Sequence, residues 1–169
     1  MNEDKHIPVL LEETLDSLHI KSLGLYIDAT VGAGGHSAEI LKRGGNVLGL
    51  DTDNSMLEIA REKLEKSCPT VDAKNRPSFK LIHANFRQIK DVATKEGFSP
   101  ANGILFDLGV SSVHFDDMNR GFSFKNPDAE LDMRLDRENL QLKASDLVNS
   151  LRLDKLRNCG GFFTCWKIF

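Results

Sequence analysis

Three glycines within four positions, following an acid, have the residue types and spacing of a nucleotide-binding turn. The apolar run Leu25–Ile27 precedes Asp28, and the turn Gly32–Gly35 leads into residues 37–42, which have helical spacing. Glycines let a backbone approach a ligand and adopt positive φ, and a helix N-terminus offers unpaired N–H groups. A strand, a glycine turn and a helix in this order therefore predict a site for a nucleotide-type ligand. An isolated glycine loop is more often an ordinary tight turn.

A second apolar run, residues 46–51, ends in Asp51, nineteen residues after Gly32. In a βαβ unit this acid lies at the tip of the second strand and can accept both ribose hydroxyls of an adenosine. The same architecture serves NAD and S-adenosylmethionine. Ser37 occupies the position of the third glycine in the dinucleotide pattern, and the acid Asp28 precedes the turn. Both features favour S-adenosylmethionine.

Two further strands are predicted at residues 79–83 and 103–108. Phe86 lies just beyond the first of them, and Asp107 lies near the end of the second. The carboxyl ends of parallel strands share one edge, which is where open α/β sheets bind ligands. We therefore expect Asp51, Phe86 and Asp107 at one ligand site. Strand-end acids can be simple helix caps, but their number beside a glycine turn favours the ligand site.

Helices and loops are expected around these strands. Pro8 fits the first turn of a helix that extends to His19 and packs on the sheet. Ser55–Glu58 matches a capping box, and Met56, Leu57, Ala60 and Leu64 supply the apolar stripe of that helix. Further helices are expected within residues 87–97 and 143–153, and loops at 68–77 and 109–117. Residues 131–136 alternate apolar and charged types, which fits an edge strand or an extended loop held together by its acids and arginine, and the surrounding loop signals favour the loop.

Composition limits the class of protein. A chain of 169 residues with 40% hydrophobic residues can form one domain with a core. The net charge of −3 gives no global signal for nucleic acid, although local patches can still contact phosphates. There is no membrane-spanning run and no signal-peptide pattern. Three cysteines without metal-like spacing (Cys68, Cys159 and Cys165) fit a reducing, cytoplasmic location, and no metal site is predicted.

Five motifs in order, with the opening His6–Leu10, resemble the ribosomal RNA small-subunit methyltransferase H family (MraW type). The motifs are Asp28–Ser37, Leu50–Asp53, Asp107–Ser112, Arg120–Phe124 and Leu131–Arg134. The resemblance runs from about residue 6 to about residue 153. It implies methylation of the exocyclic N4 of a cytidine in small-subunit (16S) ribosomal RNA by S-adenosylmethionine. It also implies an α/β, Rossmann-like class I methyltransferase fold, interrupted by a helical insertion that helps recognise the substrate.

The resemblance places donor contacts by position. They fall on Gly34, Gly35, His36, Asp51, Phe86, Asp107 and His114. His36 is open between a direct contact and a residue that only starts a helix. At Val113-His114 the family usually has Pro-Gln, which puts the contact from His114 in doubt.

Asp107 is also the candidate catalytic residue. The cytosine amino group is a poor nucleophile because its lone pair is delocalised into the ring. An acceptor for its N–H would help the nitrogen pyramidalise while the base is held in line with the methyl group. The alternative is that Asp107 only binds the donor. The target base must be unstacked to reach the site, and no general base is identified, so water can take the proton.

The chain is expected to have three parts. Residues 1–108 form the N-terminal part of the methyltransferase domain, 109–157 the start of the insertion, and 158–169 an atypical tail. Full members of the family are roughly twice as long, and the tail, which is rich in aromatic residues, does not resemble them. A shifted reading frame or truncated product explains the tail more simply than a dimer or partner anchor. The chain is accordingly expected to be inactive and marginally folded.

Three rival functions stay open. An NAD-dependent oxidoreductase is disfavoured by Ser37. A methyltransferase acting on DNA or a small molecule is harder to exclude from the residues. The third is a non-catalytic fragment that binds only the donor or a partner.

Overall fold

The structure is a computed structural model that describes residues 8–69 and 76–156. It divides into two compact units, residues 1–109 and 110–169, which are described separately. The predictions for the tail at 158–169 and for most of the 68–77 loop lie outside the described residues.

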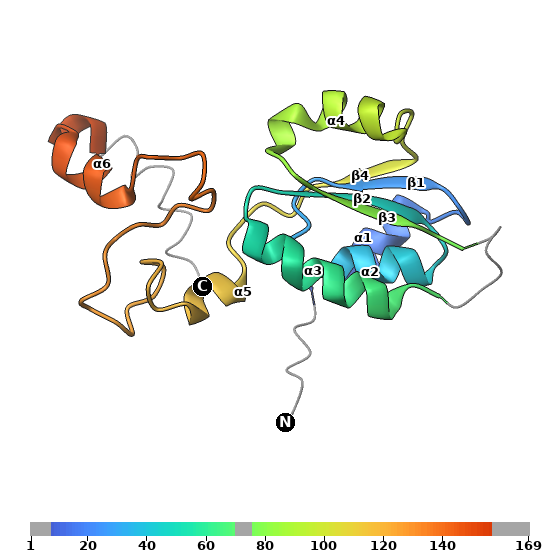
Figure 1. The fold of residues 1–169 in the computed structure, drawn as a ribbon, viewed down its shortest axis with the longest axis horizontal. Helices are drawn as coiled ribbons and strands as arrows, with labels where there is room; N and C mark the ends of the chain where they lie inside the picture. The colour runs from blue at the N-terminus through green and yellow to red at the C-terminus, as the bar shows by residue number, and fades with distance from the viewer. Residues whose placement is uncertain (1–7, 70–75, 157–169) are drawn as a thin grey trace. The chain divides into compact units, whose positions relative to one another are not determined.

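The first unit is built on a four-stranded parallel sheet (Figure 1). Its strands are β1 (Leu25–Asp28), β2 (Asn46–Asp51), β3 (Phe79–His83) and β4 (Gly103–Leu105). They lie in the order β3-β2-β1-β4, so the direction of strand addition reverses between β1 and β4. That order and the helices on both faces are those of a doubly wound sheet. The predicted α/β, Rossmann-like fold is confirmed.

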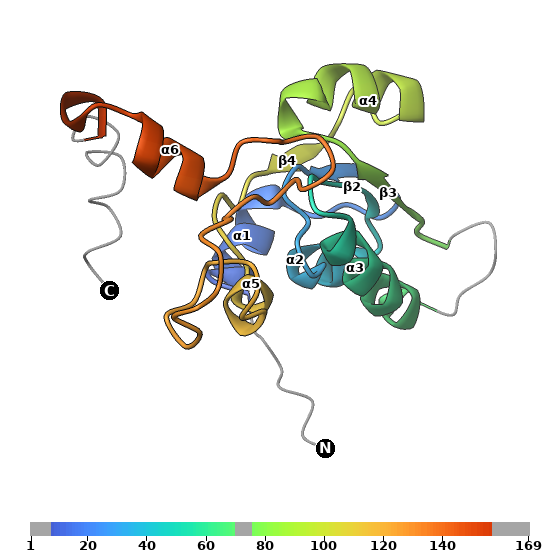
Figure 2. The ribbon, with the colours of Figure 1, turned by 60° about the vertical axis from the view of Figure 1, so that its left-hand side comes forward.

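Helices cover both faces of this sheet. Figures 1 and 2 show α4 (Ile89–Glu96) on one side and α2 (Gly35–Lys42) and α3 (Asn54–Ser67) on the other. The apolar runs of β1 and β2 are buried on both faces, which explains why they do not alternate with polar residues. One core joins α1 (Leu11–Leu18), α2 and α3 to the sheet, and a second joins α4 to it. Their buried members include Leu15, Tyr26, Ile40, Leu41, Val47 and Leu64 in the first, and Ile27, Leu48, Leu50, Ala93 and Phe98 in the second.

Two helix starts differ from the prediction. α1 begins at Leu11 and not at Pro8, because Leu10 has φ 52° and leaves the right-handed helical region. The predicted capping box at Ser55 is wrong, since α3 is capped by Asp53. The Asp53 carboxylate accepts a hydrogen bond from Ser55 N at 3.0 Å and from Ser55 Oγ at 2.6 Å. The apolar stripe predicted for this helix is buried as expected.

The fourth strand is shorter than predicted. β4 ends at Leu105, whose carbonyl accepts the last ladder hydrogen bond from Ala29 N at 2.9 Å. Asp107 therefore lies two residues beyond the strand. The helix expected within 87–97 is confirmed as α4, which a 3-10 turn at Phe86–Gln88 precedes and Gly97 ends with φ 79°.

The second unit contains α5 (Ser112–Asp116) and α6 (Ala144–Ser150). α5 lies where a loop was predicted, because Ser111 caps a short helical turn by accepting a hydrogen bond from Val113 N. α6 is shorter than the predicted helix, and its apolar residues Leu147 and Val148 are exposed.

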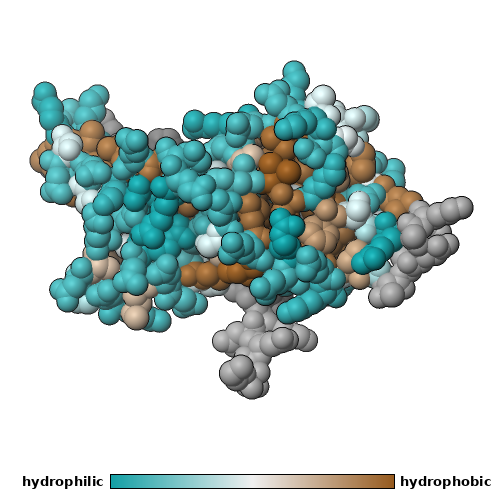
Figure 3. Space-filling view, in the orientation of Figure 1, coloured by the Kyte–Doolittle hydropathy of each residue, from teal (hydrophilic) through white to brown (hydrophobic). Residues whose placement is uncertain are grey.

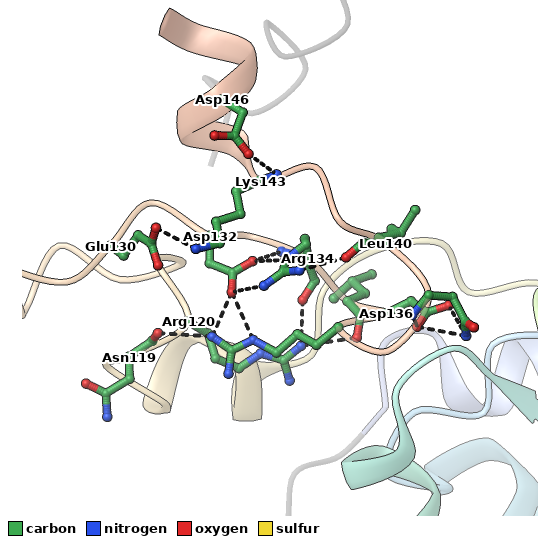
Figure 4. Close-up of polar contacts among 12 residues, drawn as sticks. Asn119, Arg120, Glu130, Asp132, Arg134, Asp136, Leu140, Lys143 and Asp146 are labelled. Carbon is green, nitrogen blue, oxygen red and sulfur yellow. Dashed lines mark hydrogen bonds and ion pairs between the residues drawn. The ribbon is translucent and has the colours of Figure 1, made fainter.

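The loop prediction for residues 131–136 is confirmed. The buried Asp132 accepts hydrogen bonds from Arg134 Nε at 2.6 Å and Nη2 at 3.0 Å, and from Arg137 Nε at 3.0 Å (Figure 4). Hydrogen bonds from these arginines hold the pKa of Asp132 well below its usual range. Gly121, with φ 75°, lets the backbone pass so close that a Cβ there would lie 2.7 Å from Asp132 N. Asp132 is thus the centre of the polar structure of this unit.

Candidate functional site

The glycine turn after β1 is shaped by close packing. Gly34 has φ 77°, and a Cβ there would lie 3.3 Å from the Cα of Ala60 on α3. A Cβ at Gly35 would overlap the ring of Pro8. Both positions therefore need glycine, and the turn lies directly at the N-terminus of α2, where backbone N–H groups lack helical partners. A helix N-terminus of this kind suits a polar or anionic ligand.

Asp51 is the last residue of β2, as predicted, and it contacts the turn. Its Oδ2 accepts a hydrogen bond from Gly32 N at 2.8 Å, and its Oδ1 accepts one from Asp53 N at 2.9 Å. Burial raises the pKa of this carboxyl, while the backbone hydrogen bonds lower it. The remaining lone pairs of the two oxygens suit hydroxyl donors such as those of a ribose.

Asp28 is buried beneath the turn. Ser37 Oγ donates a hydrogen bond to its Oδ2 at 2.7 Å, and Thr30 N donates one to its Oδ1 at 3.3 Å. Burial raises the pKa of Asp28 to about 6, against the lowering effect of these hydrogen bonds and of His36. Ser37, which in the sequence stands out only as a missing glycine, is thus the side chain that binds this acid.

The switch point between β1 and β4 brings Thr30 and Asp107 together. Thr30 Oγ1 accepts a hydrogen bond from Asp107 N at 2.7 Å. The Asp107 side chain is 58% exposed, so its carboxylate is available to a ligand at the edge where doubly wound sheets bind them. Thr30 was not among the predicted site residues, although it lies within the glycine-turn motif.

His36 is buried on the first turn of α2. Its Nε2 lies 3.2 Å from the carbonyl oxygen of Val9, so this nitrogen carries the proton, since a carbonyl only accepts. Its Nδ1 lies 3.9 Å from Asp107 Oδ2. His36 thus lies between the segment before α1 and the acid beyond β4.

Phe86 follows β3 and meets another aromatic residue. Its ring centroid lies 6.0 Å from that of Phe106 in an edge-to-face arrangement, with an interplanar angle of 85°. Phe86 is 37% exposed and Phe106 is 48% exposed, so the pair offers aromatic surface for a planar base. Phe106 was not among the predicted site residues. It was assigned to the interior of the fourth strand, which ends one residue before it.

His114 belongs to the second unit, and its predicted donor contact stays a prediction. It is buried, its Nδ1 accepts a hydrogen bond from Ser111 N at 2.9 Å, and its ring lies 5.6 Å from that of Phe122. The imidazole thereby completes the cap of α5.

Within 8–69 and 76–156, no group of three or more histidine, cysteine, aspartate or glutamate side chains is arranged to hold a metal ion. None of the helices described there has the length and apolar character needed to cross a membrane.

Comparison with known proteins identifies the family. The MraW methylase family matches residues 3–159. A relative from Acetivibrio thermocellus is 47% identical over 150 residues, which are 87% of this chain and 45% of the relative. One from Mycoplasmopsis agalactiae is 44% identical over 156 residues, 91% of this chain and 49% of the relative. Both are named ribosomal RNA small subunit methyltransferase H.

The chain spans about half the length of the curated relatives that it matches. Among solved structures, an rRNA methylase from Streptococcus thermophilus is similar with a TM-score of 0.46 and 19% identity, over 61% of this chain and 57% of that one. The family match covers nearly the whole sequence and includes every predicted site residue. The chain belongs to the MraW methylase family.

Proposed function

We propose that this chain binds S-adenosylmethionine and serves the methylation of the exocyclic N4 of a cytidine in small-subunit ribosomal RNA. The observation that carries the proposal is the hydrogen bond from Gly32 N to Asp51 Oδ2. It joins the glycine turn and the strand-tip acid, two separate sequence signals for an adenosine ligand, into one structure. The names of the relatives support ribosomal RNA as the substrate.

The residues present fit this donor. The glycine turn leads into the N-terminus of α2, whose first backbone N–H groups can donate to a polar ligand, and Asp51 has oxygens for the ribose hydroxyls. Phe86 offers a face to the adenine ring, and Asp107 and His36 complete the set at the switch point. When bound, the donor supplies an electrophilic methyl group on its sulfonium.

Asp107 is proposed to act on the target amine. Its carboxylate is exposed, while its backbone is anchored at Thr30. Accepting a hydrogen bond from the N4 amine would favour a pyramidal nitrogen and hold it in line for attack. Positioning of this kind can supply a large part of a rate enhancement. The released proton passes to water in this scheme.

The second unit is proposed to take part in recognising the substrate. We assign residues 109–157 to the start of the insertion expected from the family. Its loop structure depends on one buried acid, Asp132, with Arg134 and Arg137. The proposed substrate is ribosomal RNA of the small subunit, and the proposed location is the cytoplasm, where that substrate lies.

An Asp107→Asn variant tests the role of this acid. Turnover is measured as transfer of labelled methyl groups to small ribosomal subunits by a full-length relative carrying the equivalent change. Donor affinity is measured by calorimetry. We expect turnover to fall at least about tenfold more than donor affinity, because the amide oxygen that remains is a weaker acceptor for the target amine than the carboxylate is. Asp91→Asn, at an exposed acid of α4, is the control and should change neither quantity.

The two measurements distinguish a catalytic role of Asp107 from a role in donor binding alone. Equal losses of turnover and affinity would make Asp107 a donor-binding residue only. Mass spectrometry of the product nucleoside tests the chemistry itself. Methyl groups found on DNA, on a small molecule or on another base position would contradict N4 methylation while leaving donor binding intact.

A further inference from the structure

We propose that Thr30 is a positioning residue, which fixes Asp107 in the site by binding its backbone N–H. The inference rests on the proposed function, because it assumes that Asp107 acts in the donor site. Its direct observation is the hydrogen bond from Asp107 N to Thr30 Oγ1 at 2.7 Å. The two residues are 77 positions apart, so the hydroxyl does not serve a local turn.

Asp107 needs this hydrogen bond because the sheet ends before it. The β1–β4 ladder pairs Asp28 with Leu105, and its last hydrogen bond runs from Ala29 N to Leu105 O at 2.9 Å. Beyond this point Asp107 is 58% exposed and Leu108 is 69% exposed, so packing contributes little to their placement. The Thr30 hydroxyl takes the place of the next ladder acceptor. It continues the register of β1 and β4 across the switch point.

Thr30 is itself held in place. Its N–H donates to Asp28 Oδ1 at 3.3 Å, and Asp28 is buried and bound by Ser37 Oγ at 2.7 Å. A β-branched side chain also has few χ1 rotamers. The chain of contacts therefore runs from the buried start of α2 through Asp28 and Thr30 to Asp107.

The consequence is a defined place for the carboxylate. With its backbone fixed by Thr30, Asp107 places Oδ2 3.9 Å from Nδ1 of the buried His36. The acid thus faces the N-terminal end of α2, beside the glycine turn. Without Thr30 Oγ1, an exposed residue beyond a strand would sample many positions, and its carboxylate would seldom occupy this one.

Two substitutions separate the hydroxyl from the shape of Thr30. Thr30→Val keeps the branched shape and removes the acceptor, whereas Thr30→Ser keeps the acceptor. Amide hydrogen exchange of this chain is followed by NMR at Asp107, with Ala29 and Val31 as internal references. The reference amides donate to Leu105 O and Leu50 O in the sheet. We expect exchange at Asp107 to accelerate about tenfold in Thr30→Val, the factor that one ordinary hydrogen bond supplies.

Thr30→Ser should restore slow exchange at Asp107, and the reference amides should not change in either variant. Unaltered exchange at Asp107 in Thr30→Val would overturn the proposal. Equal acceleration at Asp107, Ala29 and Val31 would also overturn it, because the hydroxyl would then support the fold in general.

Exchange measured with saturating S-adenosylmethionine tests whether the Thr30–Asp107 hydrogen bond serves the donor site. The donor should slow exchange further at Asp107 in the wild type and in Thr30→Ser, but not in Thr30→Val. Gly34 N, which donates to Val31 O, reports donor binding independently. Protection of Gly34 without protection of Asp107 would overturn the positioning role and leave the proposed function standing. If the donor slows exchange at neither Gly34 nor Asp107, the chain does not bind the donor. The exchange rates measured without donor would then test only whether Thr30 holds the Asp107 amide.

Discussion

Gly32 and Asp51, nineteen residues apart, are joined by a hydrogen bond of 2.8 Å from the Gly32 N–H to Asp51 Oδ2. Gly32 has φ 50°, so the bond fixes an unusual backbone conformation at the start of the turn. The acid that is suited to bind ribose therefore also shapes the glycine turn. Donor binding and the conformation of the turn should respond together to changes at Asp51.

Asp51→Ala should weaken S-adenosylmethionine binding by about 1.5–3 kcal/mol, the range for hydrogen bonds to a charged group. Asp51→Asn, which keeps one acceptor oxygen, should lose less. Calorimetry on this chain gives the affinities, and thermal melting shows whether the fold survives. Asp91→Ala, at an exposed acid on α4, is the control. Unchanged affinity in Asp51→Ala would refute the assignment.

Gly34→Ala and Gly97→Ala form a matched pair. The two glycines have φ 77° and 79°, so an alanine suffers the same backbone strain, about 1–2 kcal/mol, at either position. A Cβ at Gly34 would also press on Ala60 at 3.3 Å, whereas nothing lies within 4 Å at Gly97. Denaturant unfolding should therefore show a larger loss of stability for Gly34→Ala, and only that variant should lose donor affinity. Equal losses of stability would mean that α3 moves aside at no cost.

Much of this fold follows from patterns that operate over short stretches of sequence. Short apolar runs of three to six residues predict the strands, and the positions of Asp51 and Phe86 follow from where those strands stop. One failure is local. Asp53 and Ser55 both suit a helix cap, and sequence alone does not say which one has the extended backbone that a cap needs.

The parts that could not be predicted depend on contacts between distant residues. The end of β4 is decided by β1, which offers its last ladder partner at Ala29 and then turns away. The roles of Thr30 and Ser37 depend on acids that folding brings to them, Asp107 from 77 positions away and Asp28 from nine. Single-residue types carry no signal for such pairs.

Asp28→Asn should change how stability depends on pH. The folded-state pKa of Asp28 is raised from 3.8 to about 6, so the folded chain binds this proton more tightly than the unfolded chain does. The wild type therefore loses stability as pH rises from about 4 to about 6, by roughly 2–3 kcal/mol from this group, and the contribution is constant above that window. Asp28→Asn cannot ionise and should lack this loss.

Denaturant unfolding of both proteins between pH 4 and pH 8 measures the effect. The stability of Asp28→Asn relative to the wild type should increase between pH 4 and pH 6 and then level off. Ser37→Ala removes a hydrogen bond that favours the ionised form of Asp28. This variant should therefore lose more stability than the wild type as the pH rises. A difference between Asp28→Asn and the wild type that is constant across the range would show that Asp28 titrates normally.

Asp132→Asn should loosen the second unit. It removes the charge that Arg134 and Arg137 share, and we expect a loss of roughly 2–3 kcal/mol, less than for a fully buried pair because Arg137 is half exposed. Exchange should accelerate at the amides of Met133 and Ala144, which bind backbone carbonyls around this network. Asp128→Asn, at an exposed acid of the same unit, is the control. Accelerated exchange in both variants would argue against a special role for Asp132.

The apolar edge at β4 leads to the last prediction. Ile104 is 49% exposed, and Phe106 and Leu108 continue this exposed apolar surface beyond the strand. Apolar side chains also reach the surface below α4 in Figure 3. At the opposite edge of the described sheet, β3 carries Lys80, which pairs with Glu96 at 2.9 Å. Charges of this kind deter pairing between edges, and β4 has none.

We therefore expect the chain to associate through β4 as its concentration rises, and Ile104→Lys to suppress this association. Ile59→Lys, at a residue of α3 that is 38% exposed, places the same charge away from the edge and should leave association unchanged. Sedimentation velocity over a range of concentrations measures the effect, with thermal melting to confirm that each variant folds. A wild-type chain that stays monomeric and melts cooperatively at high concentration would show that this edge does not mediate association. Equal suppression by both lysines would assign the effect to net charge, because a contact at β4 responds only to the charge placed on it.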